Sequence, residues 1–287
     1  MRFLFFFLTV LSGRLAAQTL PPASFPELTI GQWQQHLPWQ RAFYVTQTPQ
    51  KVFFSTEWAV VEIDKADRSP RFITKVEGLS DMGVRIVRYN AAVNSLLITY
   101  GNSNIDLYRL DKGSVINLPF IRTNTNIAGD KNIYDVAFDG KFAYLACGFG
   151  LVKVNIEREE VAFTTFTNGL KVLSCHLYKD HLYMGTDEGV YRIPVNDVNP
   201  IDFSRWQALG PGQGFPAGLP AAAFATYKDR LYVGMGNKLL YYNGNTTTEV
   251  ETRDNRSVLY LTTEGAGLVI GWRKDTNGEV EYLSPQE

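Results

Sequence analysis

The residues that could act as nucleophiles, bases or metal ligands are few and scattered along the chain. There are three histidines, at positions 36, 176 and 181, and two cysteines, Cys147 and Cys175. Cys175 and His176 are adjacent, which suggests a thiol beside an imidazole base. Neighbouring residues of a β-strand point to opposite faces, however, so the two side chains would not converge. We therefore expect no catalytic residues, no metal and no cofactor, and hence no enzyme.

Two other features have simpler explanations than chemistry. Asp275–Glu279 contains residues of the kind found in calcium loops but lacks their order and the closing glutamate. We expect a hairpin turn at Asn277-Gly278 instead. Cys147 and Cys175 could form a disulfide in an oxidising compartment. Because they fall in neighbouring sequence units, at a strand end and in mid-strand, we expect buried free thiols.

The composition is that of a globular chain rich in β-structure. Of 287 residues, 45% are hydrophobic and 20% are charged, which supports a packed core and argues against disorder. The net charge of −1 lacks the basic excess of a nucleic-acid-binding protein. Aromatic residues make up 13% of the chain and there are 24 glycines, which favours short strands and tight turns.

The first 17 residues have the parts of a secretory signal peptide. Arg2 precedes an apolar run, Phe3–Leu11, and Ala16-Ala17 offer a small-residue cleavage site. The run is far shorter than the ~20 residues that span a bilayer. Residues 18–27 contain three prolines and predict an extended lead-in. We expect export to the periplasm or the outer-membrane surface.

An internal repeat organises residues 28–287. Tyr178–Gly185 and Tyr227–Gly234 are identical at six of eight positions, and each predicts a β-hairpin. Weaker copies give six anchor positions spaced 37–49 residues apart: Val52, Leu97, Ala143, Leu182, Leu231 and Leu268.

A further apolar run opens eight residues after each of the first five anchors, at Val60, Ile105, Leu151, Val190 and Leu239. The turn before it holds a glycine or asparagine except at Ala59 and Lys238, so we expect those two turns to be built differently. Outer strands are predicted at 72–76 and 160–166. Four short strands in 40–50 residues is typical of a propeller blade, so we expect an all-β propeller of four-stranded antiparallel blades. An all-β sandwich is the alternative.

The two ends of the repeat array are expected to meet. Leu28–Gln34 resembles the outer-strand segment Ser204–Leu209, so we predict that the N-terminal strand completes the last blade. The ring would then close with six blades. Alternatively, the chain is a fragment of a seven-bladed ring.

The inter-blade segments carry a family resemblance. Lys75–Asp81, Phe166–Leu170 and Pro216–Pro220 share a Gly-Leu step, and Leu182–Val190 follows a Leu-Tyr-x-Gly-Thr-x-x-Gly-Val pattern. These repeats resemble the propellers of two-component sensor ectodomains. The order of Gly31-Gln32-Trp33, Lys51–Ile63 and Ile105–Tyr108 is similar to the PorZ family, surface propellers of the Bacteroidota type IX secretion system.

That resemblance implies a domain organisation and partners. Members of the family are similar in having two seven-bladed propellers and a C-terminal β-sandwich sorting domain, so this chain would correspond to a first-propeller fragment or to a short paralogue. The resemblance also implies attachment at the cell surface, a complex with the sortase-like protease and its attachment partners, and binding of anionic lipopolysaccharide.

Binding residues are expected in the loops of the propeller, since loops converge around its mouth. The loop position six residues after each anchor holds Trp58 and Phe149 where the other repeats have polar residues. These two rings could stack on a sugar or anchor a partner. Arg122 and Lys131, in the polar connection 122–132, could meet phosphate or uronate groups. Each of the four could equally be structural or simply solvated.

Three functions are compatible with this sequence. The first is a non-enzymatic scaffold of the type IX apparatus. The second is the periplasmic sensing propeller of a hybrid two-component regulator, which would need a membrane helix and a kinase. A propeller hydrolase or lyase is the third, and no converging His, Asp and Glu set supports it.

Overall fold

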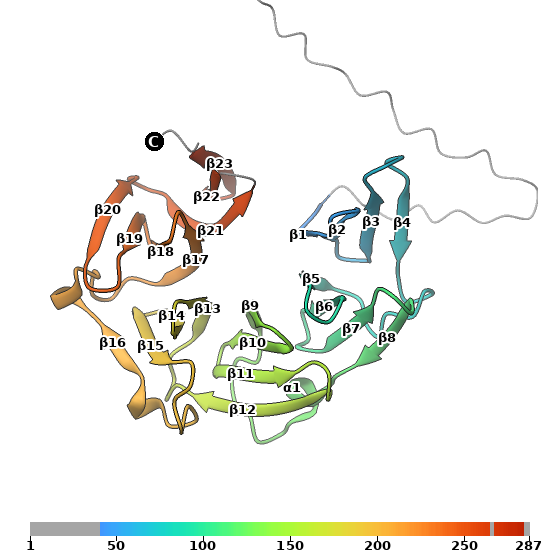
Figure 1. The fold of residues 1–287 in the computed structure, drawn as a ribbon, viewed down its shortest axis with the longest axis horizontal. Helices are drawn as coiled ribbons and strands as arrows, with labels where there is room; N and C mark the ends of the chain where they lie inside the picture. Colours follow the sequence, from blue (N-terminus) through green and yellow to red (C-terminus); the bar gives the residue numbers. More distant parts are fainter. Residues whose placement is uncertain (1–40, 265–266, 284–287) are drawn as a thin grey trace, which may run out of the picture. The chain divides into compact units, whose positions relative to one another are not determined.

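Six antiparallel sheets surround a common axis in the computed structural model, which describes residues 41–264 and 267–283 (Figure 1). Five sheets have four strands, and the sixth has three within the described residues. Among these residues, helical structure is limited to one short helix, α1 (Phe120–Thr123), and two single 3₁₀ turns. The predicted β-propeller is therefore confirmed, and its six repeat units are six blades.

Within each blade the strands run from the centre to the rim in chain order. Blades 1 and 2 contain β1 (Tyr44–Gln47), β2 (Lys51–Ser55), β3 (Val60–Asp64), β4 (Pro70–Ile73), β5 (Val84–Asn90), β6 (Ser95–Tyr100), β7 (Ile105–Arg109) and β8 (Ser114–Asn117). Blades 3 and 4 contain β9 (Ile133–Asp139), β10 (Phe142–Cys147), β11 (Gly150–Asn155), β12 (Glu160–Phe166), β13 (Val172–Tyr178), β14 (His181–Thr186), β15 (Val190–Pro194) and β16 (Gln207–Leu209). Blades 5 and 6 contain β17 (Ala221–Tyr227), β18 (Arg230–Met235), β19 (Lys238–Tyr242), β20 (Thr247–Thr252), β21 (Ser257–Glu264), β22 (Gly267–Lys274) and β23 (Asn277–Leu283).

The repeat anchors lie on the second strands as predicted, with one shift. In five blades the anchor is the second residue of that strand, but in blade 2 this residue is Leu96 and not Leu97. The hairpin loop before β6 has four residues, 91–94, whereas the loops at 140–141 and 179–180 have two. Because residues 96–98 are all apolar, spacing alone could not detect this shift.

The turn before Val60 contradicts our expectation. Thr56 donates its backbone N–H to the Ala59 carbonyl at 2.8 Å, and Thr186 does the same to Gly189 at 2.7 Å. In both turns the threonine hydroxyl also accepts the backbone N–H of the fourth residue, at 3.1 Å. The threonine closes both turns with the same hydrogen bonds, although Gly189 has a φ of +155° and Ala59 has no positive φ. The turn before β19 does differ, because Gly236 adopts a φ of +53° there.

The hairpin of blade 6 is displaced from its predicted position. Asp275 and Thr276 form the two-residue loop, and Asn277 and Gly278 are already in β23. Asp275 takes the left-handed conformation, with a φ of +50°, that we assigned to the Asn-Gly step. The other predicted outer strands are found at 70–73 and 160–166.

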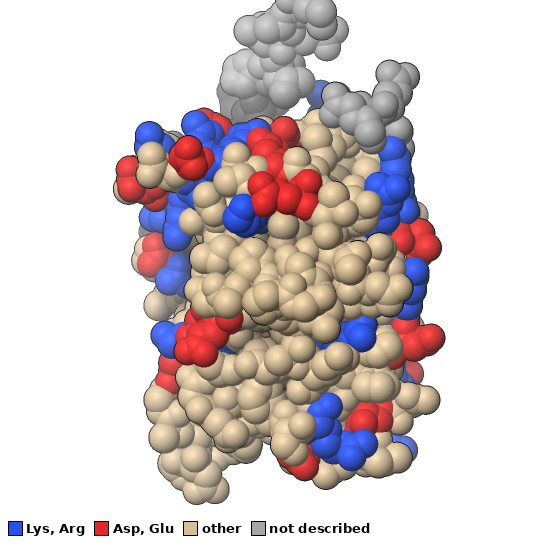
Figure 2. Space-filling model, turned by 90° about the vertical axis from the view of Figure 1, so that its left-hand side faces the viewer, with Lys and Arg blue, Asp and Glu red and all other residues tan. Residues whose placement is uncertain are grey.

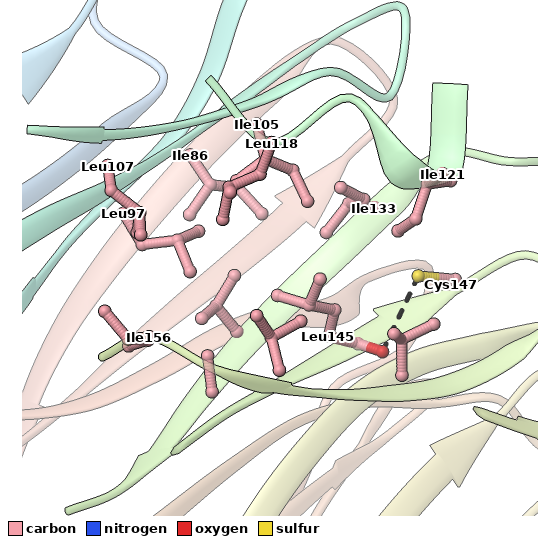
Figure 3. Close-up of a cluster of buried hydrophobic side chains, with 14 of the residues drawn as sticks. Ile86, Leu97, Ile105, Leu107, Leu118, Ile121, Ile133, Leu145, Cys147 and Ile156 are labelled. Carbon is pink, nitrogen blue, oxygen red and sulfur yellow. Dashed lines mark hydrogen bonds between the residues drawn. The ribbon is translucent and has the colours of Figure 1, made fainter. Parts of the chain in front are cut away.

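The hydrophobic core lies between blades. Figure 3 shows the cluster between blades 2 and 3, where Ile86, Leu97 and Ile105 of blade 2 meet Leu145 and Cys147 of blade 3. Similar clusters join the other consecutive pairs of blades from blade 1 to blade 6. Each sheet is thus covered mainly by its neighbours, as a propeller requires.

The seam between blade 6 and blade 1 is packed differently. Val45 pairs with Phe54 across β1 and β2. In the other blades, both residues of the equivalent pair are at most 7% exposed. These pairs are Val87–Ile98, Val136–Leu145, Cys175–Met184, Phe224–Val233 and Leu261–Ile270. Those pairs pack on the preceding blade, whereas Val45 is 51% exposed and Phe54 is half-buried. Tyr44 and Tyr260 meet edge to face across the seam, with ring centroids 6.3 Å apart.

Polar contacts also tie the innermost strands together. Arg88 on β5 donates a hydrogen bond to the Tyr44 hydroxyl of β1 at 2.7 Å and another to the Val136 carbonyl of β9. Its guanidinium lies 3.6 Å from the Asp135 carboxylate, which accepts the backbone N–H of Cys175 on β13 at 3.2 Å. Blades 1 to 4 are therefore linked around the axis.

Three predicted segments lie outside the described residues: the signal peptide at 1–17, the lead-in at 18–27, and the strand at 28–34. The compact unit that contains every described residue runs from Pro38 to Glu287.

Candidate binding site on the loop face

All four predicted binding residues lie on the same face of the propeller. In an antiparallel blade, the turn between the second and third strands and the connection to the next blade leave the sheet at the same end. Trp58 and Phe149 are in such turns, of blades 1 and 3, and Arg122 and Lys131 are in the connection between blades 2 and 3. We call this end the loop face.

Phe149 lines a pocket on the loop face. The pocket has a volume of about 430 Å³ and is lined by residues 126–130, Gly148, Phe149, Phe166, Asn168, Gly169 and Lys171. Phe149 is 8% exposed, and Phe166, at the end of β12, is 50% exposed. Their ring centroids are 5.8 Å apart at 41°. The pocket therefore offers one buried ring and one accessible ring.

Gly148 allows the connection 118–132 to approach this pocket. A Cβ at Gly148 would lie 2.5 Å from Cγ of Asp130 and 2.6 Å from its carbonyl oxygen. The Gly148 N–H donates to the Asn132 carbonyl at 3.1 Å. Because any larger residue would clash with backbone, the wall formed by residues 126–130 depends on this glycine.

One acid and one amine face each other at this wall. Asp130 accepts the Tyr134 hydroxyl at 2.6 Å and the Asn132 N–H at 2.9 Å, and lies 3.4 Å from Nζ of Lys171. Burial alone would raise the pKa of Asp130, but these donors outweigh it and hold the pKa below its usual value. Asp130 is therefore ionised at neutral pH, and Lys171, whose side chain is about half exposed, remains beside it.

Arg122 and Lys131 hold the connection in place. Arg122 donates to Asp81 Oδ2 at 2.8 Å, and Asn102 and Asn104 donate to the same oxygen at 2.9 Å. Lys131 Nζ donates to the Asn124 carbonyl at 2.7 Å, at the end of α1. Neither side chain lines the pocket beside Phe149, and an anion would have to replace these partners.

Trp58 lies two blades away from this pocket. Its side chain is half-buried, and its backbone N–H donates to the Thr56 hydroxyl at 3.3 Å. The structure thus separates Trp58 from Phe149, although both are on the loop face.

The residues weighed for catalysis do not converge. Cys175 is buried and its thiol donates to the Tyr144 carbonyl at 3.4 Å, while Nε2 of His176 lies 2.8 Å from the Thr226 hydroxyl of blade 5. Burial, with a smaller contribution from the Arg88 charge, lowers the pKa of His176 to about 4. Cys147 and Cys175 are both free and buried. Within residues 41–264 and 267–283, no group of three or more His, Cys, Asp or Glu could hold a metal.

Phe166, Asp130 and Lys171 were not identified from the sequence. Phe166 ends an outer strand immediately before the Thr-Asn-Gly-Leu step, and no spacing rule places it beside the turn of the previous strand pair. The only indication in the sequence is an aromatic residue at the end of an outer strand, directly before the inter-blade turn.

The visible surface on the side of the described propeller that carries β16 and β20 has no broad patch of a single charge. Figure 2 shows this side with acidic and basic side chains mixed at its margins and a wide band without charges between them. This agrees with the near-zero net charge of the chain.

A family model described as TSS9, PorZ, N-terminal beta-propeller domain matches residues 52–207. A search of curated proteins found no match. Among solved structures, PorZ of Porphyromonas gingivalis, a surface component of the type IX secretion system, is 21% identical with a TM-score of 0.58. The match covers 84% of this chain and 38% of PorZ.

Two other solved structures share the fold. The extracellular domain of BT4673, a putative one-component system protein of B. thetaiotaomicron, is 16% identical with a TM-score of 0.62, over 86% of this chain and 32% of that one. The propeller of Cps50 (Swd1) from Myceliophteria thermophila is 10% identical with a TM-score of 0.60, over 85% and 83%. The chain therefore spans well under half of the first two proteins.

Proposed function

Because the chain belongs to the family of PorZ N-terminal β-propeller domains, we propose that it is a non-enzymatic attachment component of a type IX secretion system. The observation that carries this proposal is the family match, which runs from β2 of blade 1 to the first residue of β16 in blade 4. The propeller fold supports it, because such folds commonly present loops to partners.

The proposed location is the cell surface or the periplasm. The basic and apolar start of the chain supports export. None of the described helices has the length and apolar character needed to cross a membrane. The proposed partners are the sortase-like protease of the system and the proteins that attach it to the outer membrane.

The proposed ligand is an anionic lipopolysaccharide, bound on the loop face. The accessible ring of Phe166 would stack on a sugar, as aromatic rings commonly do in binding sites. Lys171 would donate to a phosphate or uronate group once it releases Asp130. Trp58, Phe149, Arg122 and Lys131 remain in the proposal as residues of the same face.

Deletion of the gene in its native bacterium tests the attachment role. We expect type IX cargo to accumulate unprocessed inside the cell and secretion to return when the full-length gene is restored. Normal secretion by the deletion strain would contradict the proposal. Purification of the tagged full-length protein should also recover the sortase-like protease.

A sensing propeller of a two-component regulator is the second candidate. The similarity to the BT4673 extracellular domain favours it. The two functions separate in the same deletion strain, because loss of a sensor would change transcription of its target genes and leave cargo processing intact.

A further inference from the structure

A second pocket, the axial pocket, lies among the innermost strands, at the end of the propeller opposite the loop face. It has a volume of about 520 Å³, within the range of pockets that hold small molecules. Four blades contribute to its lining, through Tyr44–Gln47 and Val52 of blade 1, Arg88 and Tyr89 of blade 2, Phe138 of blade 3, and Tyr260, Thr262 and Thr263 of blade 6.

The positions of these residues along their strands place the axial pocket at that end. The first strand of each blade begins at the loop face and ends at the turn to the second strand, and these strands surround the centre of the ring (Figure 1). Tyr89 and Phe138 are the penultimate residues of β5 and β9. Gln47 is the last residue of β1, and Thr263 is the penultimate residue of β21. The axial pocket is therefore separate from the pocket beside Phe149.

Aromatic rings form much of the wall of the axial pocket. Four partly exposed rings contribute to it: Tyr44, Tyr89, Phe138 and Tyr260. Tyr44 and Tyr260 meet edge to face across the seam, and the Arg88 guanidinium lies 5.4 Å from the centre of the Tyr44 ring. Rings of this kind offer flat apolar surface on which the C–H face of a sugar can stack.

Hydroxyl groups add donors and acceptors to the wall. Leu261 belongs to the core cluster between blades 5 and 6. Because alternate residues of a strand share a face, Tyr260 and Thr262 are on the other face of β21, away from blade 5. Thr46 Oγ1 accepts the backbone N–H of Tyr89 at 3.1 Å, and a hydroxyl that accepts one hydrogen bond can also donate one. Such groups suit a ligand whose own hydroxyls both donate and accept.

The charge at the axial pocket has a counterion. Among the described residues that line it, Arg88 alone is charged. Its guanidinium lies 3.6 Å from the Asp135 carboxylate and donates to the Tyr44 hydroxyl and the Val136 carbonyl. An ionised ligand would have to compete with Asp135 and also lose water from its own charge, which costs free energy. A guanidinium has five N–H donors, so Arg88 can still donate to a hydroxyl of an uncharged ligand.

We propose that the axial pocket binds an uncharged sugar. The rings of Tyr44 and Tyr260 would pack against its C–H face, and Thr46, Thr262 and Arg88 would hydrogen-bond to its hydroxyls. This site differs in position and in chemistry from the loop-face pocket, where an amine and a carboxylate face each other and the proposed ligand is anionic. The proposal therefore does not depend on the function of that pocket.

Saturation-transfer NMR and titration calorimetry on the purified full chain test the proposal. The probes are D-glucose, D-galactose and D-mannose, and the uronate of each sugar is its charged counterpart. We expect at least one of the three uncharged sugars to bind with a Kd of about 1 mM or lower. Its uronate should bind at least tenfold more weakly. No detectable binding of any of the three, or tighter binding of the uronates, would overturn the proposal.

Matched variants place the bound sugar. Thr262→Val removes one hydroxyl at nearly constant size and should weaken binding about fivefold. Thr164→Val, at a partly exposed threonine on the outer strand of blade 3, is its control and should leave the Kd unchanged. Tyr260→Leu removes one ring and should weaken binding about tenfold in a protein that circular dichroism shows to be folded.

The loop-face variant Phe166→Ser separates the two pockets. It should leave binding of the uncharged sugar unchanged, whether or not it lowers capture of lipopolysaccharide. Loss of sugar binding in Phe166→Ser, with normal binding by Tyr260→Leu and Thr262→Val, would place the sugar on the loop face and overturn the proposal. Equal binding by the wild type and all of these variants would overturn it as well.

Discussion

The guanidinium of Arg88 in blade 2 lies 3.6 Å from the carboxylate of Asp135 in blade 3. Burial raises the pKa of Asp135, and the Arg88 charge counteracts this effect. Both side chains are on innermost strands, so one ion pair joins two blades beside the axis. The pair is partly accessible, with side-chain exposures of 30% and 18%.

Replacing Arg88 alone should therefore destabilise the protein. Arg88→Met leaves Asp135 without its cation and removes the donors to Tyr44 and Val136. We expect a loss of about 2 kcal/mol in the free energy of unfolding, below the range for fully buried pairs. Urea denaturation measures it. Arg88→Met with Asp135→Leu should recover part of the loss, and no recovery would show that the cost comes from the other donors.

The neutral His176 should make stability depend on pH. Its pKa is about 4 in the folded protein and about 6.5 in an unfolded chain. Between these values the unfolded state binds the proton and the folded state does not, so stability falls as pH falls from 6.5 to 4. The slope should be about 1 kcal/mol per pH unit.

His176→Gln keeps a nitrogen donor near Thr226 and removes the titration. Unfolding free energies of both proteins at pH 7 and pH 5 isolate the histidine, since Arg88 and Asp135 are common to both. If the free energies of unfolding of the wild type and the variant differed by the same amount at pH 7 and pH 5, this account would be refuted.

The two cysteines should be inert in the folded protein. Burial raises the pKa of Cys147 and of Cys175 well above the usual thiol value. A colorimetric thiol reagent at pH 8 should therefore modify neither thiol in native protein and both in guanidinium. Rapid modification of either thiol in the native state would mean that the interface between blades opens.

Removing the accessible ring of the loop-face pocket should weaken glycan binding. Phe166→Ser should reduce capture of anionic lipopolysaccharide about tenfold, if stacking contributes about 1.4 kcal/mol. Because Phe166 is half-exposed, its loss should change the melting temperature little. Val198→Ser, at an 89% exposed apolar residue of blade 4, is the matched control. Unchanged capture by the folded variant would remove Phe166 from the proposed site.

Gly148→Ala should disturb the same pocket through the backbone. The added Cβ would lie 2.5 Å from Asp130, so residues 126–130 must move. We expect a destabilisation of about 1–3 kcal/mol, as for other overpacked positions. Gly210→Ala, where a Cβ meets nothing within 4 Å, should be nearly neutral. Thermal unfolding compares the two variants.

Much of the fold was predictable because equivalent positions of the repeat have the same buried environment in successive blades. An anchor such as Leu182 needs the same burial as Leu231, so selection for packing leaves the same residue type at a fixed spacing. Leu97 and Ala59 show where this reasoning fails. The apolar run 96–98 conceals the one-residue shift in blade 2. In the turn before Val60, the Thr56 side chain supplies the closing hydrogen bond, where we expected a glycine or asparagine to be needed.

The pocket was less predictable than the fold. Phe149 is predictable because it occupies a loop position that recurs in each repeat. Phe166 is the last residue of β12, and no recurring position of the repeat marks it. Arg122 and Lys131 were sought as free cations, but Asp81 and the Asn124 carbonyl engage them. Partners of this kind depend on three-dimensional proximity that spacing does not encode.

The exposed Val45 has a consequence for how the molecule comes apart. Blades 2 to 6 are each packed against the preceding sheet, while the first has no equivalent cover, so fraying should start at β1 and β2 and advance around the array. Amide hydrogen exchange should then be faster in the first hairpin than in the hairpins of blades 3 and 4, which have buried clusters on both sides. A circularly permuted chain that began elsewhere in the array would move the fast-exchanging end with it.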